Sequence, residues 1–237
     1  MIKHHNKLGQ PIGHPMDNWQ PCPTPSPIEM SGSFCQLQPL NCAKHAEDLY
    51  SHFQLDSENK IWTYLPYGPF KDFSEFSNWL TQKSQSQDPL FFAIIDKNSG
   101  RALGVASFLR MVENNGVIEV GHINYSPKLQ KTPAATEAMY LMMQYAFEEL
   151  GYRRYEWKCD SLNNGSRNAA TRLGFTFEGI FRQALIYKGR NRDTAWYSIT
   201  DQEWPALKTA FESWLASSNF NEQGVQIKSL GEIQKQR

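Results

Sequence analysis

The chain has 237 residues, of which 40% are hydrophobic and 20% charged, so it can bury a core of its own and is not a disordered chain. Its 24 Lys and Arg residues balance its 24 Asp and Glu residues, which excludes an overall field that would attract nucleic acid or anionic membranes. The N-terminus lacks the apolar stretch of a signal peptide, and no segment reaches the roughly 18 apolar residues of a spanning helix. The four cysteines form no CxxC pair. We therefore expect a cytoplasmic protein with reduced thiols and no metal, nucleic-acid or membrane partner.

Residues 1–32 are predicted to form a Pro-rich extended arm. Proline fixes φ and has no N–H, so a segment such as PCPTPSP (21–27) favours an extended chain over a helix or strand. Trp19 is the expected apolar anchor of this arm on the surface of the domain. The same segment could instead serve as a ligand for a proline-binding domain.

The first half of the domain, which is predicted to span 33–216, contains two helices and four strands. Residues 33–40 alternate as in a strand, and Asn41 is a plausible N-cap for a helix over 42–54. An aromatic loop over 62–70 precedes a second helix over 72–82. Apolar segments then follow, separated by turns typical of hairpins, and they predict a meander of strands over 89–96, 103–112 and 117–125.

The second half begins with the clearest helix, over 134–150, which Gly151 ends. A strand over 152–159, a short helix over 166–173 and strands over 175–186 and 194–200 are expected next, before a last helix over 204–214. Residues 217–237 are polar and are expected to form a loose tail. This order of elements predicts an α/β or α+β sheet domain.

The start of the long helix is a candidate anion site. Thr132 is a plausible N-cap and Pro133 a plausible first helical residue, while the small side chains of Ala134 and Ala135 leave the backbone open. Free N–H groups at the positive end of a helix dipole attract phosphate groups, and Lys131 lies beside them. Almost every helix has such an end, so an ordinary capped helix also accounts for the pattern.

Several motifs in order resemble the GNAT superfamily of CoA-dependent N-acyltransferases, and in particular a bacterial subfamily of its ribosomal-protein (RimJ/RimL-like) branch. The family pattern [Q/R]-x-x-G-x-[G/A] falls on Gln130–Ala135, N-x-x-S falls on Asn163 and Ser166, and LGF on Leu173–Phe175. The resemblance covers roughly residues 33–215. It implies a central mixed, mostly antiparallel sheet of about seven strands flanked by helices. It also implies an acetyl-CoA-dependent N-acetyltransferase that is a monomer or a homodimer.

The resemblance implies a site for acetyl-CoA as co-substrate. Its pyrophosphate would lie on the N–H groups of 131–136, and its pantetheine would follow the end of the 117–125 strand. The cofactor-binding residues implied in this way are Ile123, Tyr125, Gln130, Lys131, Thr132, Ala134, Ala135, Thr136, Asn163, Ser166 and Arg172. Pro133 replaces the central glycine of the family loop, so one phosphate donor is lost, because proline has no N–H.

Glu119 is the predicted catalytic base. An amine must lose its proton before it accepts an acyl group, and in several GNAT enzymes a strand carboxylate at the spacing of Glu119 removes it. A structural bond to a neighbouring strand is an equally good explanation of this carboxylate. His122 and Tyr125 are alternative bases, although strict alternation places His122 on the other face unless Gly121 marks a bulge.

Ser166 is the second predicted catalytic residue. Many GNAT enzymes protonate the leaving thiolate with a tyrosine, but Ala170 occupies that position here. We therefore expect the hydroxyl of Ser166 to donate a hydrogen bond to the sulfur. No nucleophile elbow or reactive-cysteine motif is present, so direct transfer in a ternary complex is expected rather than an acyl-enzyme.

The amine acceptor is the least specified partner, and a protein N-terminus or a small amine both fit. Its expected wall consists of Trp62, Tyr64, Tyr67 and His122. Arg190 and Arg192 could meet an acidic acceptor or simply fill a hairpin turn. Two other functions stay open: a non-catalytic CoA- or acyl-CoA-binding module, and an interaction protein that uses the Pro-rich arm.

Overall fold

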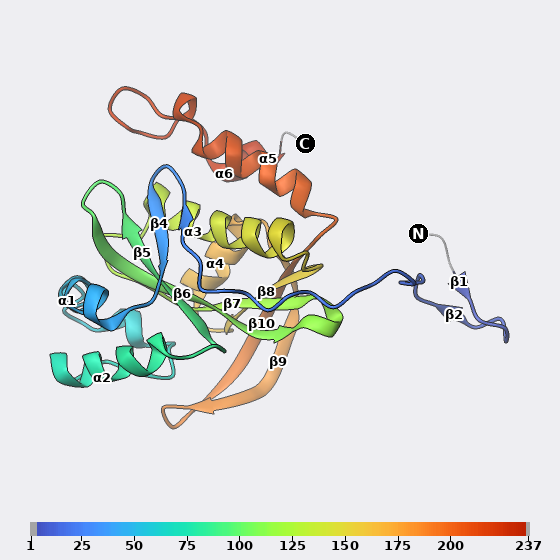
Figure 1. The fold of residues 1–237 in the computed structure, drawn as a ribbon, viewed down its shortest axis with the longest axis horizontal. Coiled ribbons are helices and arrows are strands. Elements are labelled where there is room, and N and C mark those ends of the chain that lie inside the picture. The colour runs from blue at the N-terminus through green and yellow to red at the C-terminus, as the bar shows by residue number, and fades with distance from the viewer. Residues whose placement is uncertain (1–3, 236–237) are drawn as a thin grey trace.

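The computed structural model describes residues 4–235, and its body is a twisted sheet with helices on both faces (Figure 1). Eight strands lie in the order β3-β4-β5-β6-β7-β8-β10-β9, and every neighbouring pair is antiparallel except β7 and β8. The strands are β3 (Met30–Ser31), β4 (Cys35–Pro39), β5 (Leu90–Asp96), β6 (Arg101–Val112), β7 (Val117–Tyr125), β8 (Arg154–Asp160), β9 (Thr176–Tyr187) and β10 (Arg190–Thr200). The expected fold class is thus confirmed, with eight strands where about seven were expected, because the two residues of β3 pair with β4.

Two layers of helices cover the sheet. The helices are α1 (Cys42–Phe53), α2 (Phe73–Ser84), α3 (Pro133–Gln144), α4 (Asn164–Arg172), α5 (Trp204–Leu215) and α6 (Leu230–Lys235). α1 and α2 share a buried cluster with β5 and β6, and α3 and α5 share another with the opposite face of the sheet. Asn41 caps α1 as predicted, and Asp72 caps α2. α3 ends earlier than predicted because Leu150 bonds to the carbonyl of Tyr145, five residues back, in a π-helical turn.

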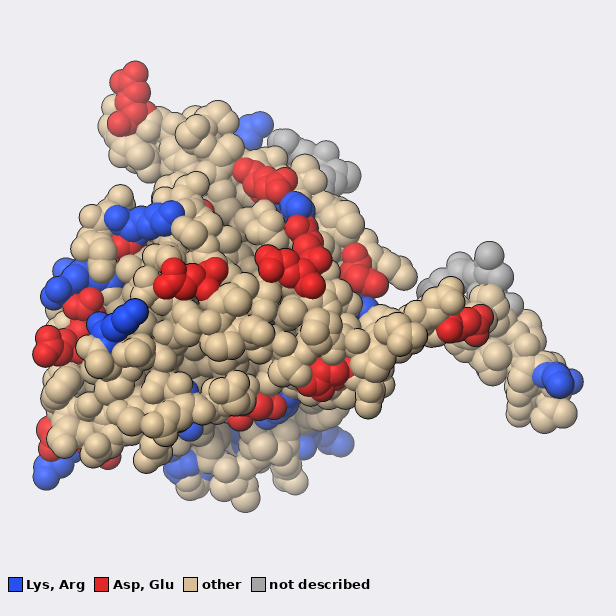
Figure 2. Space-filling model, in the orientation of Figure 1, with Lys and Arg blue, Asp and Glu red and all other residues tan. Residues whose placement is uncertain are grey.

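Both ends of the described chain lie outside the sheet. A small hairpin of β1 (His4–His5) and β2 (Pro11–Ile12) stands away from the body (Figures 1 and 2). The Pro-rich segment then lies on the domain, where the indole of Trp19 donates to the carbonyl of Asn114 and the hydroxyl of Tyr152 donates to that of Pro23. After α5 the structure differs from the expected loose tail, because Leu230 of α6 is only 1% exposed and packs with α5 in the core.

A buried carboxylate fixes α3 against the start of the sheet. Glu137 is 3% exposed, and its oxygens accept hydrogen bonds from the amides of Ser33, Phe34 and Cys35 at 2.6, 2.6 and 2.7 Å. Such charge-assisted bonds satisfy donors that would otherwise be buried without a partner. The first turns of α3 are therefore held in one position relative to β4. None of the helices within residues 4–235 has the length and hydropathy needed to cross a bilayer.

β7 and β8 separate halfway along their length. Their parallel pairing covers only Val117–Val120 opposite Arg154–Trp157, after which β7 follows β6 and β8 follows β10. A bulge accompanies the separation, since His122 and Ile123 of β7 oppose the single residue Ala106 of β6. His122 has a φ of 51°, a left-handed conformation that breaks the alternation of side chains at this point.

Candidate active site

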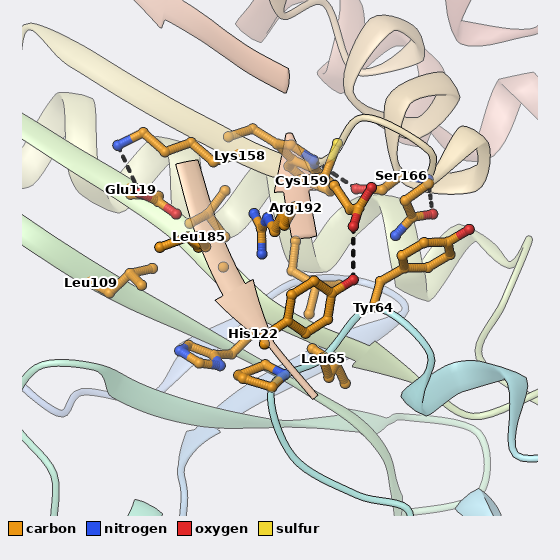
Figure 3. Close-up of a pocket in the computed structure, with 18 of the residues that line it drawn as sticks. Tyr64, Leu65, Leu109, Glu119, His122, Lys158, Cys159, Ser166, Leu185 and Arg192 are labelled. Carbon is orange, nitrogen blue, oxygen red and sulfur yellow. Dashed lines mark hydrogen bonds and ion pairs between the residues drawn. The ribbon is translucent and has the colours of Figure 1, made fainter. Parts of the chain in front are cut away.

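A cavity of about 370 Å³ lies where β7 and β8 separate (Figure 3). The end of β7, the end of β8 and the start of α4 form part of its wall. The end of β6, the turn over 60–66 and the hairpin of β9 and β10 form the rest of the wall. The tip of that hairpin is tied to the turn. Lys188 Nζ donates to the carbonyl of Trp62 and Arg190 Nη2 to that of Thr63, each at 2.7 Å. Two segments more than 120 residues apart in the chain therefore enclose one cavity.

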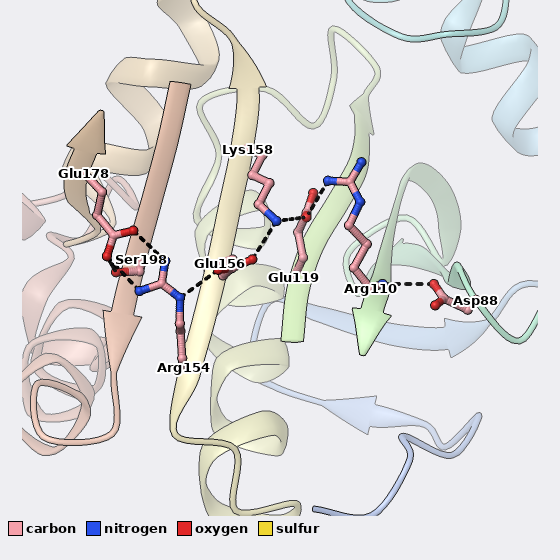
Figure 4. Close-up of polar contacts among 8 residues, drawn as sticks. All are labelled: Asp88, Arg110, Glu119, Arg154, Glu156, Lys158, Glu178 and Ser198. Atoms are coloured by element: carbon pink, nitrogen blue, oxygen red, sulfur yellow. Dashed lines mark hydrogen bonds and ion pairs between the residues drawn. The ribbon is translucent and has the colours of Figure 1, made fainter. Parts of the chain in front are cut away.

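Glu119 lies in this cavity at the centre of an ion-pair network (Figure 4). It is 4% exposed, and its Oε2 accepts from Arg110 Nη1 and from Lys158 Nζ, both at 2.9 Å. Lys158 also binds Glu156 at 2.6 Å, and Glu156 is in turn held by Arg154. Glu119 Oε1 lies beside Gly121 and has no hydrogen-bond partner among residues 4–235.

Two opposing effects act on the ionisation of Glu119. Burial raises its pKa above the usual value of a glutamate, because a charged group loses its hydration in the interior. The positive charges of Lys158 and Arg110 act in the other direction and are smaller in effect. A carboxylate with a raised pKa is a stronger base than an ordinary glutamate, and Oε1 is free to receive the proton.

The bulge in β7 brings His122 into the same cavity as Glu119, which strict alternation would not allow. The His122 ring stacks on Tyr67 with centroids 5.6 Å apart, and its Nδ1 lies 3.1 Å from the Tyr67 hydroxyl. Burial lowers the pKa of His122 to about 4, helped by the charges of Lys83, Arg110 and Arg192. The imidazole is therefore neutral at pH 7.

The depressed pKa of His122 predicts a loss of stability in mild acid. The unfolded chain binds a proton near the ordinary value of 6.5 and the folded chain only near 4, so the stabilisation is complete above 6.5 and is lost as pH falls towards 4. We expect the wild type to lose about 1 to 2 kcal/mol more than His122→Asn between pH 7 and pH 5. Asparagine tolerates the left-handed φ. Urea unfolding at both pH values measures the difference, and equal losses would contradict the assignment.

Tyr125 lies outside the cavity wall. Its hydroxyl donates to the carbonyl of Ala135 at 3.3 Å, so it faces α3. Burial raises the pKa of this phenol far above its usual value, and a base that remains protonated cannot accept a proton. Ile123, two residues earlier, does line the cavity, on the part of β7 that no longer pairs with β8.

The start of α4 holds Ser166 and Asn163 at the cavity. The side chain of Asn163 caps the helix by accepting from the Ser166 amide at 3.1 Å. The indole N–H of Trp157 donates to Ser166 Oγ at 2.9 Å. A hydroxyl has one donor and two acceptor sites, so the bond from Trp157 does not use the O–H of Ser166. The same hydroxyl forms a hydrogen bond with the side chain of Cys159, which acts to lower the pKa of that thiol. The short helix expected over 166–173 begins two residues earlier, with Asn163 as its cap.

The loop before α3 presents backbone donors. Thr132 is the N-cap as predicted, with its Oγ1 accepting from the Ala135 amide at 3.2 Å. The amides of Lys131 and Ala134 have no acceptor in hydrogen-bonding range within the described part of the chain. Lys131 is exposed, whereas the side chains of Ala134, Ala135 and Thr136 are buried beneath the loop.

Two long polar side chains brace this loop. Gln130 Nε2 donates to the carbonyl of Tyr125 at 3.0 Å, which ties the loop to the end of β7. Arg172 Nη2 donates to Thr136 Oγ1 at 2.5 Å, so the end of α4 lies against the start of α3. The loop residues implied by the resemblance are therefore together in space, with a basic side chain beside them.

The aromatic loop contributes less of the acceptor wall than expected. Trp62 is 4% exposed and belongs to the core cluster under α1 and α2, so it does not line the cavity, contrary to the expectation. Tyr67 reaches the site only through its contact with His122, while Tyr64 and Leu65 line the cavity directly.

Sequence reasoning did not identify Arg110 and Lys158 as site residues. Each approaches Glu119 from a different strand, β6 and β8, so no spacing along the chain indicates their contact. The segment from Gly151 to Arg192 contains nine Lys and Arg residues and three acidic residues. This excess of basic residues was the available signal for Lys158, but it did not distinguish that residue from its basic neighbours.

The chain is similar to several known proteins. The family model described as an acetyltransferase (GNAT) domain matches residues 36–176, more than half of the chain. A GCN5-related N-acetyltransferase of known structure from Brucella melitensis is 48% identical, with a TM-score of 0.91 over 93% of this chain and 100% of that one. The uncharacterized N-acetyltransferase YnaD of Bacillus subtilis is 22% identical over 67% of this chain and 91% of its own length.

A more distant structure carries ligands. The microcin C7 self-immunity acetyltransferase MccE, solved in complex with acetyl-CoA and AMP, is 25% identical, with a TM-score of 0.62 over 71% of this chain and 93% of that one. The family match, the mostly antiparallel sheet and the opening between β7 and β8 agree with one another. The chain belongs to the GNAT family and is an acetyl-CoA-dependent acetyltransferase.

Proposed function

We propose that the protein transfers an acetyl group from acetyl-CoA directly to an amine in a ternary complex, with Glu119 as base and Ser166 as hydrogen-bond donor to the leaving sulfur. The observation that carries the proposal is that one cavity, at the separation of β7 and β8, contains both side chains. They come from different elements, so an amine and a thioester could meet between them without a covalent enzyme intermediate.

The residues present fit acetyl-CoA. The free amides of Lys131 and Ala134 offer donors to a pyrophosphate at the start of α3. Pro133 offers no donor there, so its neighbours would hold the phosphates in its place. The unpaired end of β7 near Ile123 offers backbone groups to the pantetheine arm, and Asn163 stands at the cavity end of α4.

Glu119 would take the amine proton through Oε1, directly or through water, because Oε2 is occupied by Arg110 and Lys158. The neutral amine then attacks the thioester carbonyl, and the bond between carbon and sulfur breaks. The nitrogen loses its second proton to solvent or to the departing sulfur, which gives the amide and CoA. The thiolate accepts a hydrogen bond from the Ser166 hydroxyl, whose oxygen is held by Trp157. His122 is a weaker choice of base because its pKa is lowered to about 4.

The motif at Asn163 and Ser166 favours the RimJ/RimL-like branch within the family, and we place the chain there as a proposal. Acetyl-CoA with a panel of amines tests the activity itself, by release of free thiol. Turnover with any amine supports the transferase. Binding of CoA with no turnover across the panel would favour the non-catalytic CoA-binding module instead.

Replacing Ser166 with alanine should lower kcat about tenfold, or about 1.4 kcal/mol, as expected for one lost donor. A CoA thiol has a pKa not far from the roughly 8.5 of cysteine, so its thiolate leaves tolerably well without full protonation. The acid limb of the pH–rate profile, which belongs to Glu119, should be unchanged. Stopped-flow or steady-state thiol release measures kcat and its pH dependence. If Ser166→Ala has wild-type rates at every pH, water rather than Ser166 donates the hydrogen bond to the leaving thiolate.

A further inference from the structure

The cavity contains four cationic side chains and two carboxylates, and their pairing is uneven. Arg110 and Lys158 both pair with Glu119, Lys158 also pairs with Glu156, and Lys60 pairs with Glu58. The fourth cation, Arg192 of β10, has no carboxylate within ion-pair distance among residues 4–235. The second carboxylate, Asp160, is engaged by the Tyr187 hydroxyl at 2.8 Å and by the Leu162 amide at 2.9 Å.

Arg192 is held in place without being neutralised. Its Nε donates to Thr194 Oγ1 at 3.1 Å, and its guanidinium lies 5.9 Å from the centre of the Tyr187 ring. The bond from Tyr187 to Asp160 fixes that ring. The two terminal nitrogens of Arg192 have no hydrogen-bond acceptor among the described residues, so the donors that form a planar fork remain available. Figure 3 shows Arg192 inside the cavity, between Leu185 and Cys159.

We propose that Arg192 binds an oxyanion of the acceptor, so that the enzyme acetylates amines that carry a carboxylate or a phosphate. This inference rests on the proposed function and narrows its acceptor. A guanidinium binds either group through two parallel hydrogen bonds, and it does so best where water is partly excluded. The charge of Arg192 acts inside the cavity, since it helps to lower the pKa of His122. A polycationic acceptor would be repelled by this unneutralised positive charge. Polyamines and aminoglycosides are therefore disfavoured.

The test compares acceptors that differ in the oxyanion alone. Amino acids are paired with their amides, and phosphoethanolamine with ethanolamine, and spermidine serves as the cationic acceptor. We expect wild-type kcat/KM to favour the oxyanion member of at least one pair. Arg192→Gln should lower kcat/KM at least tenfold for the member that carries the oxyanion and less than threefold for the neutral member. Comparing the variant with the wild type for each acceptor cancels intrinsic differences in amine reactivity. The pair that responds identifies carboxylate or phosphate.

Arg182→Gln is the matched control, since it removes the same charge from an exposed position on β9 outside the cavity wall. Arg182→Gln should leave the ratio of kcat/KM between the two members of every acceptor pair at its wild-type value. Calorimetric titration of the same pairs into the complex with CoA gives a readout independent of turnover. A wild-type preference for spermidine, or equal losses for both members of each pair, would overturn the inference.

Two further outcomes are informative. A loss of CoA affinity in Arg192→Gln would assign the guanidinium to the cofactor and also overturn the inference. If no amine is acetylated although oxyanion-bearing ligands bind in an Arg192-dependent way, the proposed transferase activity fails while the oxyanion site stands.

Discussion

Glu119→Gln should lower kcat by a factor of about 10² to 10⁴ with little change in CoA affinity. Glutamine has nearly the shape of glutamate and can still accept from Arg110 and Lys158 through its remaining oxygen, but it cannot take a proton from an amine. Because burial raises the pKa of Glu119, wild-type kcat should fall as pH decreases through that raised value. The variant should lose this acid limb. Steady-state thiol release between pH 5 and pH 9 measures both effects.

Glu156→Gln is the control that distinguishes a catalytic role of Glu119 from a purely structural one. Glu156 also binds Lys158 and is as deeply buried, at 6% exposed, but it does not line the cavity. Substitution there should disturb the ion-pair network and lower the midpoint of thermal unfolding, while kcat changes less than about threefold. Equal losses of kcat in the two variants would mean that Glu119 acts only as a structural partner of Lys158, and the role of base would pass to His122 or to water.

Lys131→Glu should weaken CoA binding about thirtyfold, or about 2 kcal/mol. The substitution replaces an exposed positive charge with a negative one beside the free amides at the start of α3, and two charges near a protein surface interact by up to about 4 kcal/mol at contact. Lysine and glutamate are equally strained at the left-handed φ of 61° of this position, so the substitution acts mainly through charge. Isothermal titration with CoA at two salt concentrations measures it.

Lys44→Glu provides the control, since this exposed lysine lies on α1. It changes the net charge by the same amount and should leave CoA affinity unchanged. The Lys131→Glu effect should also shrink as ionic strength rises, because salt screens exposed charges. If Lys131→Glu binds CoA with unchanged affinity, the pyrophosphate does not bind at this loop.

Local patterns in the sequence determined the elements and their order. The caps at Asn41 and Thr132 and the apolar periods of the helices and strands act within a few residues of each other, so they can be recognised from the chain alone. The same holds for the N-x-x-S motif, in which Asn163 caps α4 and fixes the amide of Ser166 three residues later. The GNAT resemblance followed from such motifs, and the fold agrees with it.

Tertiary structure alone decided which charges meet in the cavity. The pairing of Glu119 with Arg110 and Lys158 joins three strands, and the unpaired state of Arg192 depends on where every other carboxylate lies. The bulge at His122 likewise places its side chain on the opposite face of β7 from the one that alternation predicts. The reason is that β7 has one extra residue relative to β6 at this point. Long-range contacts of this kind have no period or spacing along the chain. The sequence therefore predicted the scaffold and the capped start of α3, whereas the electrostatics of the site came from the packing of distant strands.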